Sequence, residues 1–326
     1  MLCRFFHLPC RKTAYNDSRV ISMQAMFENV AVLLIFGAIG WFLGKRHILS
    51  SQNLKLLSVL EVWVFLPCNS MRSFSRYFTV EYFLDKYPVL IVSALIVTAL
   101  ALVNAWLVPR FVKGSYRQHI FHYALTLPNY GYVGYALVQG VYGDMMLLNA
   151  QMFALPMSIY TNTEGYRLLT NSGSVSWRKI LNPTIVAIFA GCIIGLTGWE
   201  LPSVLASVVD KGSACMGPIS MLLAGITISD YPMEMLLKDK PSYLVTGFRL
   251  LVIPLVLAVL LAPFLDREMV LVAVLLYACP CGLNTIVYPR LIGEDCRPGA
   301  SMAMISTVAS LGTLPLCMQV LEWIVK

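Results

Sequence analysis

The chain has 326 residues, of which 58% are hydrophobic and 13% charged. Soluble domains carry about 25% charged residues, so this composition excludes a water-soluble enzyme. It also excludes a disordered chain, which requires low hydrophobicity. The net charge of +7 would suit nucleic acid. The lysines and arginines lie in short segments between apolar runs, however, which indicates a lipid bilayer as the partner and no nucleic acid.

The 9 cysteines show no spacing that is typical of a zinc site. Most of them lie inside apolar segments, where cysteine behaves as a small hydrophobic residue. We therefore expect neither a metal nor any other cofactor.

The sequence predicts an all-α membrane protein with ten spans, since a spanning helix needs roughly 20 apolar residues. In chain order the spans cover residues 27–44, 53–71, 88–109, 117–140, 145–169, 183–199, 202–228, 242–265, 269–291 and 299–324. The first, third, sixth and eighth are almost continuously apolar. The others contain polar residues, prolines or glycines, which lipid tolerates only where they face protein or a water-filled cavity.

Basic residues concentrate in the odd-numbered loops, which the positive-inside rule places in the cytoplasm, with both termini outside. They are Lys45, Arg46, Lys55, Arg110, Lys113, Arg117, Arg167, Arg178, Lys179, Lys238, Lys240, Arg290 and Arg297. The basic N-terminal tail, residues 1–26, does not fit this orientation and lacks the apolar core of a signal peptide. We hypothesise that translation starts at Met23 or Met26.

The two halves of the chain share a pattern at an offset of about 151 residues. The matched residues are Pro67 with Pro218, Pro128 with Pro280, and Gly143-Asp144 with Gly293-Glu294-Asp295. Each half, 27–169 and 183–326, holds five spans. Because five is odd, the second half enters the membrane upside down relative to the first, which is typical of transporters.

Two of the spans are predicted to be broken in the middle, the fourth at Pro128 and the ninth at Pro280, because proline removes a backbone donor and nearby glycine permits non-helical geometry. Half-helices present free amides that suit an anion, and asparagine amides can bind a carboxylate without burying a charge. The alternative is that both helices are merely kinked. The predicted substrate-binding residues are Pro128, Asn129, Tyr130, Gly131, Gln151, Pro280, Cys281, Gly282 and Asn284.

Ionisable residues within spans are functional candidates. Glu61 and Asp210 precede the matched prolines Pro67 and Pro218, and either carboxylate could bind a coupling proton or sodium ion. Arg249 could neutralise an anion, pair with one of these carboxylates, or anchor the membrane interface, and we favour the interface. His122 precedes the first break. We favour a hydrogen-bonded packing role for this histidine over a titrating one.

The sequence resembles the auxin efflux carrier superfamily, which includes plant PIN-formed carriers and bacterial malonate and malate permeases. The similarity covers about residues 27–326 in order. It rests on Leu127-Pro128-Asn129 with Gly134, Pro280-Cys281-Gly282, Asn182-Pro183, Leu201-Pro202, Asp210 with Gly212, Phe248-Arg249-Leu250 with Pro254, and Leu314-Pro315. Only about 15 residues, 168–182, join the fifth and sixth spans, as in the short bacterial members.

The resemblance implies ten helices in two inverted repeats, with helices four and nine crossing. Helices one, two, six and seven would form a scaffold, and helices three to five and eight to ten a transport domain. It further implies a small organic anion as substrate, a mono- or dicarboxylate, a bacterial inner-membrane location, and dimerisation through the scaffold.

Other functions stay open at this stage. A bile-acid/sodium symporter type of carrier also crosses its fourth and ninth helices, and a membrane sensor could use a transporter-like fold only to bind. The phosphate-binding pattern GxxxxGK[ST] is absent, so this chain does not hydrolyse ATP through such a loop. Paired intramembrane aspartates and HExxH are also absent, so we do not expect an enzyme.

Overall fold

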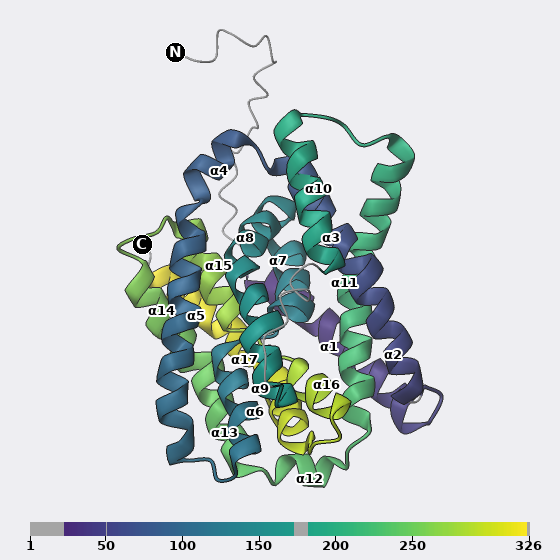
Figure 1. The fold of residues 1–326 in the computed structure, drawn as a ribbon, viewed down its shortest axis with the longest axis vertical. Coiled ribbons are helices and arrows are strands. Elements are labelled where there is room, and N and C mark those ends of the chain that lie inside the picture. Colours follow the sequence, from purple (N-terminus) through teal and green to yellow (C-terminus); the bar gives the residue numbers. More distant parts are fainter. Residues whose placement is uncertain (1–22, 50, 173–181, 325–326) are drawn as a thin grey trace.

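A computed structural model describes residues 23–49, 51–172 and 182–324, and these fold into a bundle of helices (Figure 1). No β-strand occurs among them, which confirms the predicted all-α class. The tail before Met23, whose basic residues suggested a later translation start, lies outside the described part, as does most of the loop around 168–182.

The described residues of the first half form nine α-helices joined by short connections. They are α1 (Met23–Lys45), α2 (Ser51–Leu60), α3 (Leu66–Tyr77), α4 (Val80–Lys86), α5 (Pro88–Leu107), α6 (Ser115–Thr126), α7 (Tyr135–Tyr142), α8 (Asp144–Tyr160) and α9 (Tyr166–Thr170). Wider π-helical turns η1 (Glu61–Phe65), η3 (Tyr130–Gly134) and η4 (Thr161–Gly165) and the 3-10 turn η2 (Val108–Arg110) lie between them.

The second half continues the bundle. Its described elements are α10 (Pro183–Thr197), α11 (Ser203–Ser229), α12 (Met233–Leu237), α13 (Lys240–Gly247), the π-helical turn η6 (Phe248–Val252), α14 (Ile253–Leu261), α15 (Arg267–Tyr277), α16 (Asn284–Leu291) and α17 (Arg297–Ile324). Polar caps begin two of these helices: the Asn182 and Asp266 side chains accept hydrogen bonds from Ile185 N–H and Met269 N–H, respectively.

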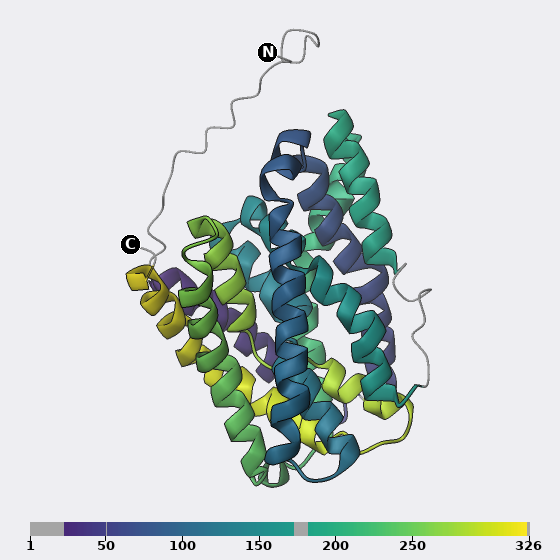
Figure 2. The same ribbon diagram turned by 60° about the vertical axis from the view of Figure 1, so that its left-hand side comes forward.

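Five of the described helical segments are long and apolar enough to cross a bilayer: Phe27–Lys45, Pro88–Arg110, Ser203–Ser229, Lys240–Leu261 and Arg297–Ile324. Helix α10 is apolar but shorter. The other expected spans are divided by π-helical turns or breaks, so the count of ten stays a prediction. Helix α5 runs the height of the bundle on its outer face (Figure 2), and its Leu102 is 68% exposed. An aqueous surface would not favour such residues, whereas lipid does.

The connections between helices lie at two opposite ends of the bundle. Helix α12 and the turn between α5 and α6 lie at the lower end in Figure 1, whereas α4 and the turn between α10 and α11 lie at the upper end. This alternation is the one expected for successive membrane spans.

Helices α1 and α11 approach each other closely at glycines. A methyl group at Gly40 would overlap the main chain of Leu222, and one at Gly44 would overlap the side chain of Ser229. Small residues four apart allow two helix backbones to touch, which is how membrane helices associate without a hydrophobic driving force.

Helices α10 and α3 make the corresponding contact. A methyl group at Gly191 would lie 3.6 Å from the carbonyl oxygen of Met71, and one at Gly195 would overlap the carbonyl of Phe78. All four positions are displaced by 151 residues from those of the α1–α11 contact, with the two halves of the chain exchanged.

The buried core surrounds the breaks that follow α6 and α15. Eight of the residues along α15 are fully or almost fully enclosed, namely Met269, Val270 and the residues Val272, Ala273, Val274, Leu275, Leu276 and Tyr277. Helix α15 is thus shielded by other helices. It is therefore the outer helices that carry most of the exposed apolar side chains.

Candidate functional site

The two predicted breaks touch each other. Helix α6 ends at Thr126 and helix α15 ends at Tyr277. Beyond them Pro128 and Cys281 form an isolated antiparallel bridge, and the Asn129 N–H donates to the Pro280 carbonyl at 2.8 Å. The structure therefore brings together the two segments that the sequence singled out, although 152 residues separate their prolines.

The first break turns back into helix through η3. The Asn129 carbonyl accepts hydrogen bonds from Val133 N–H at 3.1 Å and Gly134 N–H at 3.0 Å. Space adjoins this turn, because a methyl group at Gly131 would meet no atom within 4 Å. The Tyr130 hydroxyl lies 3.2 Å from the hydroxyl of Thr161 in η4. The first break thus has a satisfied main chain and room beside it.

The second break is enclosed. The Cys281 N–H donates to the Ser306 hydroxyl of α17 at 2.9 Å, and the Asn284 side chain donates to the Tyr123 hydroxyl of α6 at 2.9 Å. A methyl group added at Gly282 would lie 3.6 Å from the carbonyl oxygen of Pro128. Among the predicted residues, Asn284 and Gly282 therefore lie at the meeting point of the two breaks.

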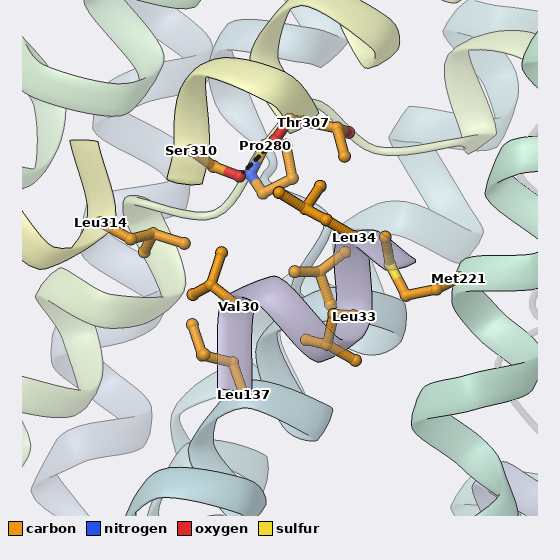
Figure 3. A pocket seen from close by; sticks show the side chains of 10 residues that line it. Val30, Leu33, Leu34, Leu137, Met221, Pro280, Thr307, Ser310 and Leu314 are labelled. Carbon is orange, nitrogen blue, oxygen red and sulfur yellow. Dashed lines mark hydrogen bonds between the residues drawn. The ribbon is translucent and has the colours of Figure 1, made fainter. Parts of the chain in front are cut away.

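A small cavity lies beside Pro280, between α1 and α17 (Figure 3). Pro280 sits next to Thr307 and Ser310 of α17, and the aliphatic side chains of α1 lie on the other side in this view. The lining residues are Val30, Leu33, Leu34, Val133, Leu137, Met221, Pro280, Thr307, Ser310 and Leu314. The cavity is mostly apolar, with two hydroxyls near the second break.

Arg249 is completely buried, which corrects the expectation that it anchors the membrane interface. It lies in η6 and reaches the end of α6, where its Nε and Nη2 atoms donate to the Ala124 carbonyl at 3.0 and 2.6 Å. This carbonyl needs a donor because its helical partner would be the residue four positions later, Pro128, which has no N–H. The guanidinium also lies 5.7 Å from the ring centre of Tyr277, the last residue of α15.

Glu61 is also completely buried, but on the α2–α11 side. It accepts a hydrogen bond from the Ser220 hydroxyl of α11, and its second oxygen has no hydrogen-bond partner among the described residues. No ion pair joins it to Arg249 in the described part of the chain. Both residues lie in π-helical turns, as does Tyr130, and such turns are frequent at functional sites.

Asp210 lies away from the breaks. Its side chain is 39% exposed. Both carboxylate oxygens accept hydrogen bonds from Arg76 Nη2, at 2.7 and 2.8 Å. The structure therefore places one of the two carboxylate candidates in an exposed ion pair. His122 lies 3.2 Å from the Tyr160 hydroxyl, the hydrogen-bonded packing that its position suggested.

Gln151 points to α3 instead of the breaks. Its side-chain N–H donates to Asn69 at 2.8 Å and to Ser70 at 3.4 Å. Asn69 in turn donates to Gln139 of α7 at 3.0 Å and to Ser213 of α11 at 3.1 Å. Sequence reasoning missed this buried amide network. The one available signal was an amide two residues after Pro67, resembling the Pro128-Asn129 pair.

A metal site is not evident in the described residues, since no three His, Cys, Asp or Glu side chains gather there in a way that could hold a metal ion. The breaks therefore offer main-chain amides, side-chain amides, hydroxyls and one buried guanidinium. These groups can bind and orient an anion, and they include no activated nucleophile.

Comparison with known proteins assigns the chain to a family. Residues 25–174 and 160–318 match the family described as "Membrane transport protein", which lies within the auxin efflux carrier superfamily. The chain belongs to this family. This match confirms the family resemblance found in the motifs. The protein is therefore an integral membrane transport protein.

Two proteins that are similar to this chain are described as transporters. An "Uncharacterized transporter" of Methanothermobacter thermautotrophicus is 27% identical over 199 residues, covering 59% of this chain and 65% of that protein. The chain thus spans just under two thirds of that relative. The "Uncharacterized transporter YfdV" of Escherichia coli K12 is 21% identical over 299 residues, covering 87% of this chain and 94% of that protein.

Proposed function

We propose that this membrane transport protein is a secondary carrier of a small organic anion, a mono- or dicarboxylate, that works by alternating access. The observation that carries the proposal is the direct contact of the two breaks, with the Asn129 N–H bonded to the Pro280 carbonyl. Interrupted helices that meet inside a bundle typify the substrate site of such carriers.

The chemistry of the breaks favours an anion. Helices resume just after each break, at Tyr130 and at Asn284, so their N-terminal amides carry partial positive charge. Arg249 adds a full positive charge behind them. The Asn129 side-chain amide makes no hydrogen bond with the described residues, which leaves a donor for a carboxylate oxygen.

We further propose the ten-span arrangement of two inverted repeats with crossing fourth and ninth helices. The matched glycine contacts support it, since α1 on α11 and α10 on α3 use positions 151 residues apart. These four helices, with α2, would form the scaffold. Helices α5–α9 and α13–α17 would form the moving transport domain.

Two sets of contacts would have to alternate in such a cycle. At one end, Arg72 of α3 binds Asp144 of α8 at 2.8 Å, next to the Asn69–Gln139 hydrogen bond. At the other end, Arg290 of α16 binds Asp230, which follows α11, at 3.0 Å. Figure 1 places α3 in the upper half and α16 in the lower half. Opening either end breaks one set and can keep the other.

The remaining parts of the proposal follow the family resemblance. The protein would reside in a bacterial inner membrane with both termini outside and form a homodimer through the scaffold. Glu61 would carry a coupling proton or sodium ion, because its second carboxylate oxygen is unpaired among the described residues. Asp210 is a weaker candidate, since Arg76 already neutralises it.

The test is uptake of labelled malonate, malate, butyrate and phenylacetate into proteoliposomes, with and without proton and sodium gradients. We expect flux of at least one compound, and a loss of about tenfold or more in Asn129→Ala. Asn162→Ala, in η4, is the matched control, since that amide donates to the carbonyl of Ser158 in its own helix. Flux of none of the four by folded protein would overturn the carrier, and binding without flux would indicate a sensor. Strict sodium dependence would instead favour the bile-acid/sodium symporter type.

A further inference from the structure

Arg249 has a buried environment that its structural role does not require. Of the described side chains, only Glu61 and Arg249 are both buried and formally charged. Burying an ion costs several kcal/mol unless it is paired, and no carboxylate pairs with Arg249 in the described part of the chain. A retained, unpaired cation inside a membrane protein is a functional candidate.

Capping the end of α6 does not by itself need a positive charge. On the same helix end, the neutral Asn104 side chain donates to the Thr126 hydroxyl at 3.1 Å. A neutral amide N–H that reaches a side-chain hydroxyl at this helix end could equally donate to the Ala124 carbonyl. The guanidinium, in contrast, also leaves its Nη1 atom without a hydrogen-bond partner among the described residues.

The position of the guanidinium is electrostatically significant. It binds the last turn of α6 and lies against Tyr277 at the end of α15. Both are C-terminal helix ends, which carry partial negative charge and would repel an anion at the breaks. A fixed cation at this point cancels that repulsion, so the positive ends of η3 and α16 dominate the field at the breaks.

We propose that Arg249 is a positioning residue that makes the crossed breaks selective for anions, acting through the ends of α6 and α15 without touching the substrate. The inference rests on the proposed carrier function and extends it. It predicts that the charge of Arg249, as distinct from its shape, sets the preference for a carboxylate over an uncharged ligand of the same size.

The test compares matched ligand pairs on purified full-length protein. Apparent affinities are measured by thermal stabilisation for malonate against malonamide, butyrate against butyramide, and phenylacetate against phenylacetamide. For whichever pair stabilises the wild type, Arg249→Gln should weaken carboxylate binding by about tenfold and leave amide binding unchanged, as expected for the loss of a nearby unit charge in a partly buried site. Arg249→Lys should keep the preference, and the exposed Arg46→Gln should not change it.

The outcomes separate the two proposals. A wild-type protein that responds to none of the six compounds defeats the carrier function and the inference with it. A wild type that binds a carboxylate, together with an Arg249→Gln variant that keeps the same carboxylate-to-amide ratio, overturns the inference alone. So does equal weakening of both ligands, which a purely structural role would give. If the glutamine variant fails to fold, the lysine variant decides. Loss of the preference for carboxylate over amide in a folded Arg249→Lys protein contradicts the proposal.

Discussion

The two breaks carry prolines at matched positions, but the protein satisfies the freed backbone differently at each. At the first break, a side chain from another helix, Arg249, caps the Ala124 carbonyl that Pro128 leaves without a donor. At the second, the Leu276 carbonyl, four residues before Pro280, accepts a hydrogen bond from the nearby Cys279 N–H at 3.2 Å. The first break has space beside Gly131, whereas the side chains of Cys279 and Cys281 at the second are fully or almost fully buried.

This difference shows that a repeat in sequence does not make two equivalent half-sites. The helix contacts on the α1–α11 and α10–α3 sides are equivalent position by position, whereas the breaks are not. The first break, with space beside Gly131, is suited to contact with a ligand, and the second break, with its buried cysteines, is suited to holding the first in place. Substitutions at these positions test whether the halves are equal at the glycines and unequal at the breaks.

The largest effect is expected at the glycine contacts. Gly40→Leu and Gly191→Leu should each lower the free energy of unfolding by roughly 3 kcal/mol or more, because the added side chain meets a neighbouring helix and cannot be accommodated without separating the pair. Thermal unfolding in detergent measures this. Gly312→Leu, where a methyl group meets no atom within 4 Å, is the control. A large loss in one half only would argue against equivalent contacts.

Two glycines of the first break should behave oppositely. A methyl group at Gly134 would lie 2.8 Å from Leu276, so Gly134→Leu should destabilise the protein by about 2 kcal/mol. Gly131→Leu should leave the unfolding temperature within the range of surface substitutions. It should reduce proteoliposome flux more than tenfold by filling the space beside the break. If Gly131→Leu transported normally, the ligand would not use that space.

The smallest effect is expected at the second break. Ser306→Ala removes the acceptor of the buried Cys281 N–H, which should cost about 1 kcal/mol of stability. Transport should change little, because this hydrogen bond supports the enclosed break. Thr313→Ala, whose hydroxyl bonds only within its own helix, serves as the reference. A strong loss of transport in Ser306→Ala with unchanged stability would place the ligand at the second break.

Sequence reasoning located the breaks because proline and glycine act on the local backbone, and Pro128 and Pro280 do interrupt their helices. It did not predict the hydrogen bond from Gln151 to Asn69, since the rotation of α8 relative to α3 depends on tertiary packing. The partner of Arg249 could not be predicted either. That partner is the main-chain carbonyl of Ala124, and a carbonyl leaves no mark on residue identity.

The matched glycine contacts also have a consequence for how the chain is made. Helix α1 packs on α11, roughly 180 residues further along the chain. At a synthesis rate of about 5–20 residues per second, α1 leaves the ribosome roughly 10–40 s before its partner. During that interval the glycine face of α1 contacts lipid or an insertion factor. The pairing of a helix from one half with a helix from the other therefore delays assembly, and the first helix meets this partner only after about two thirds of the 326 residues have been made.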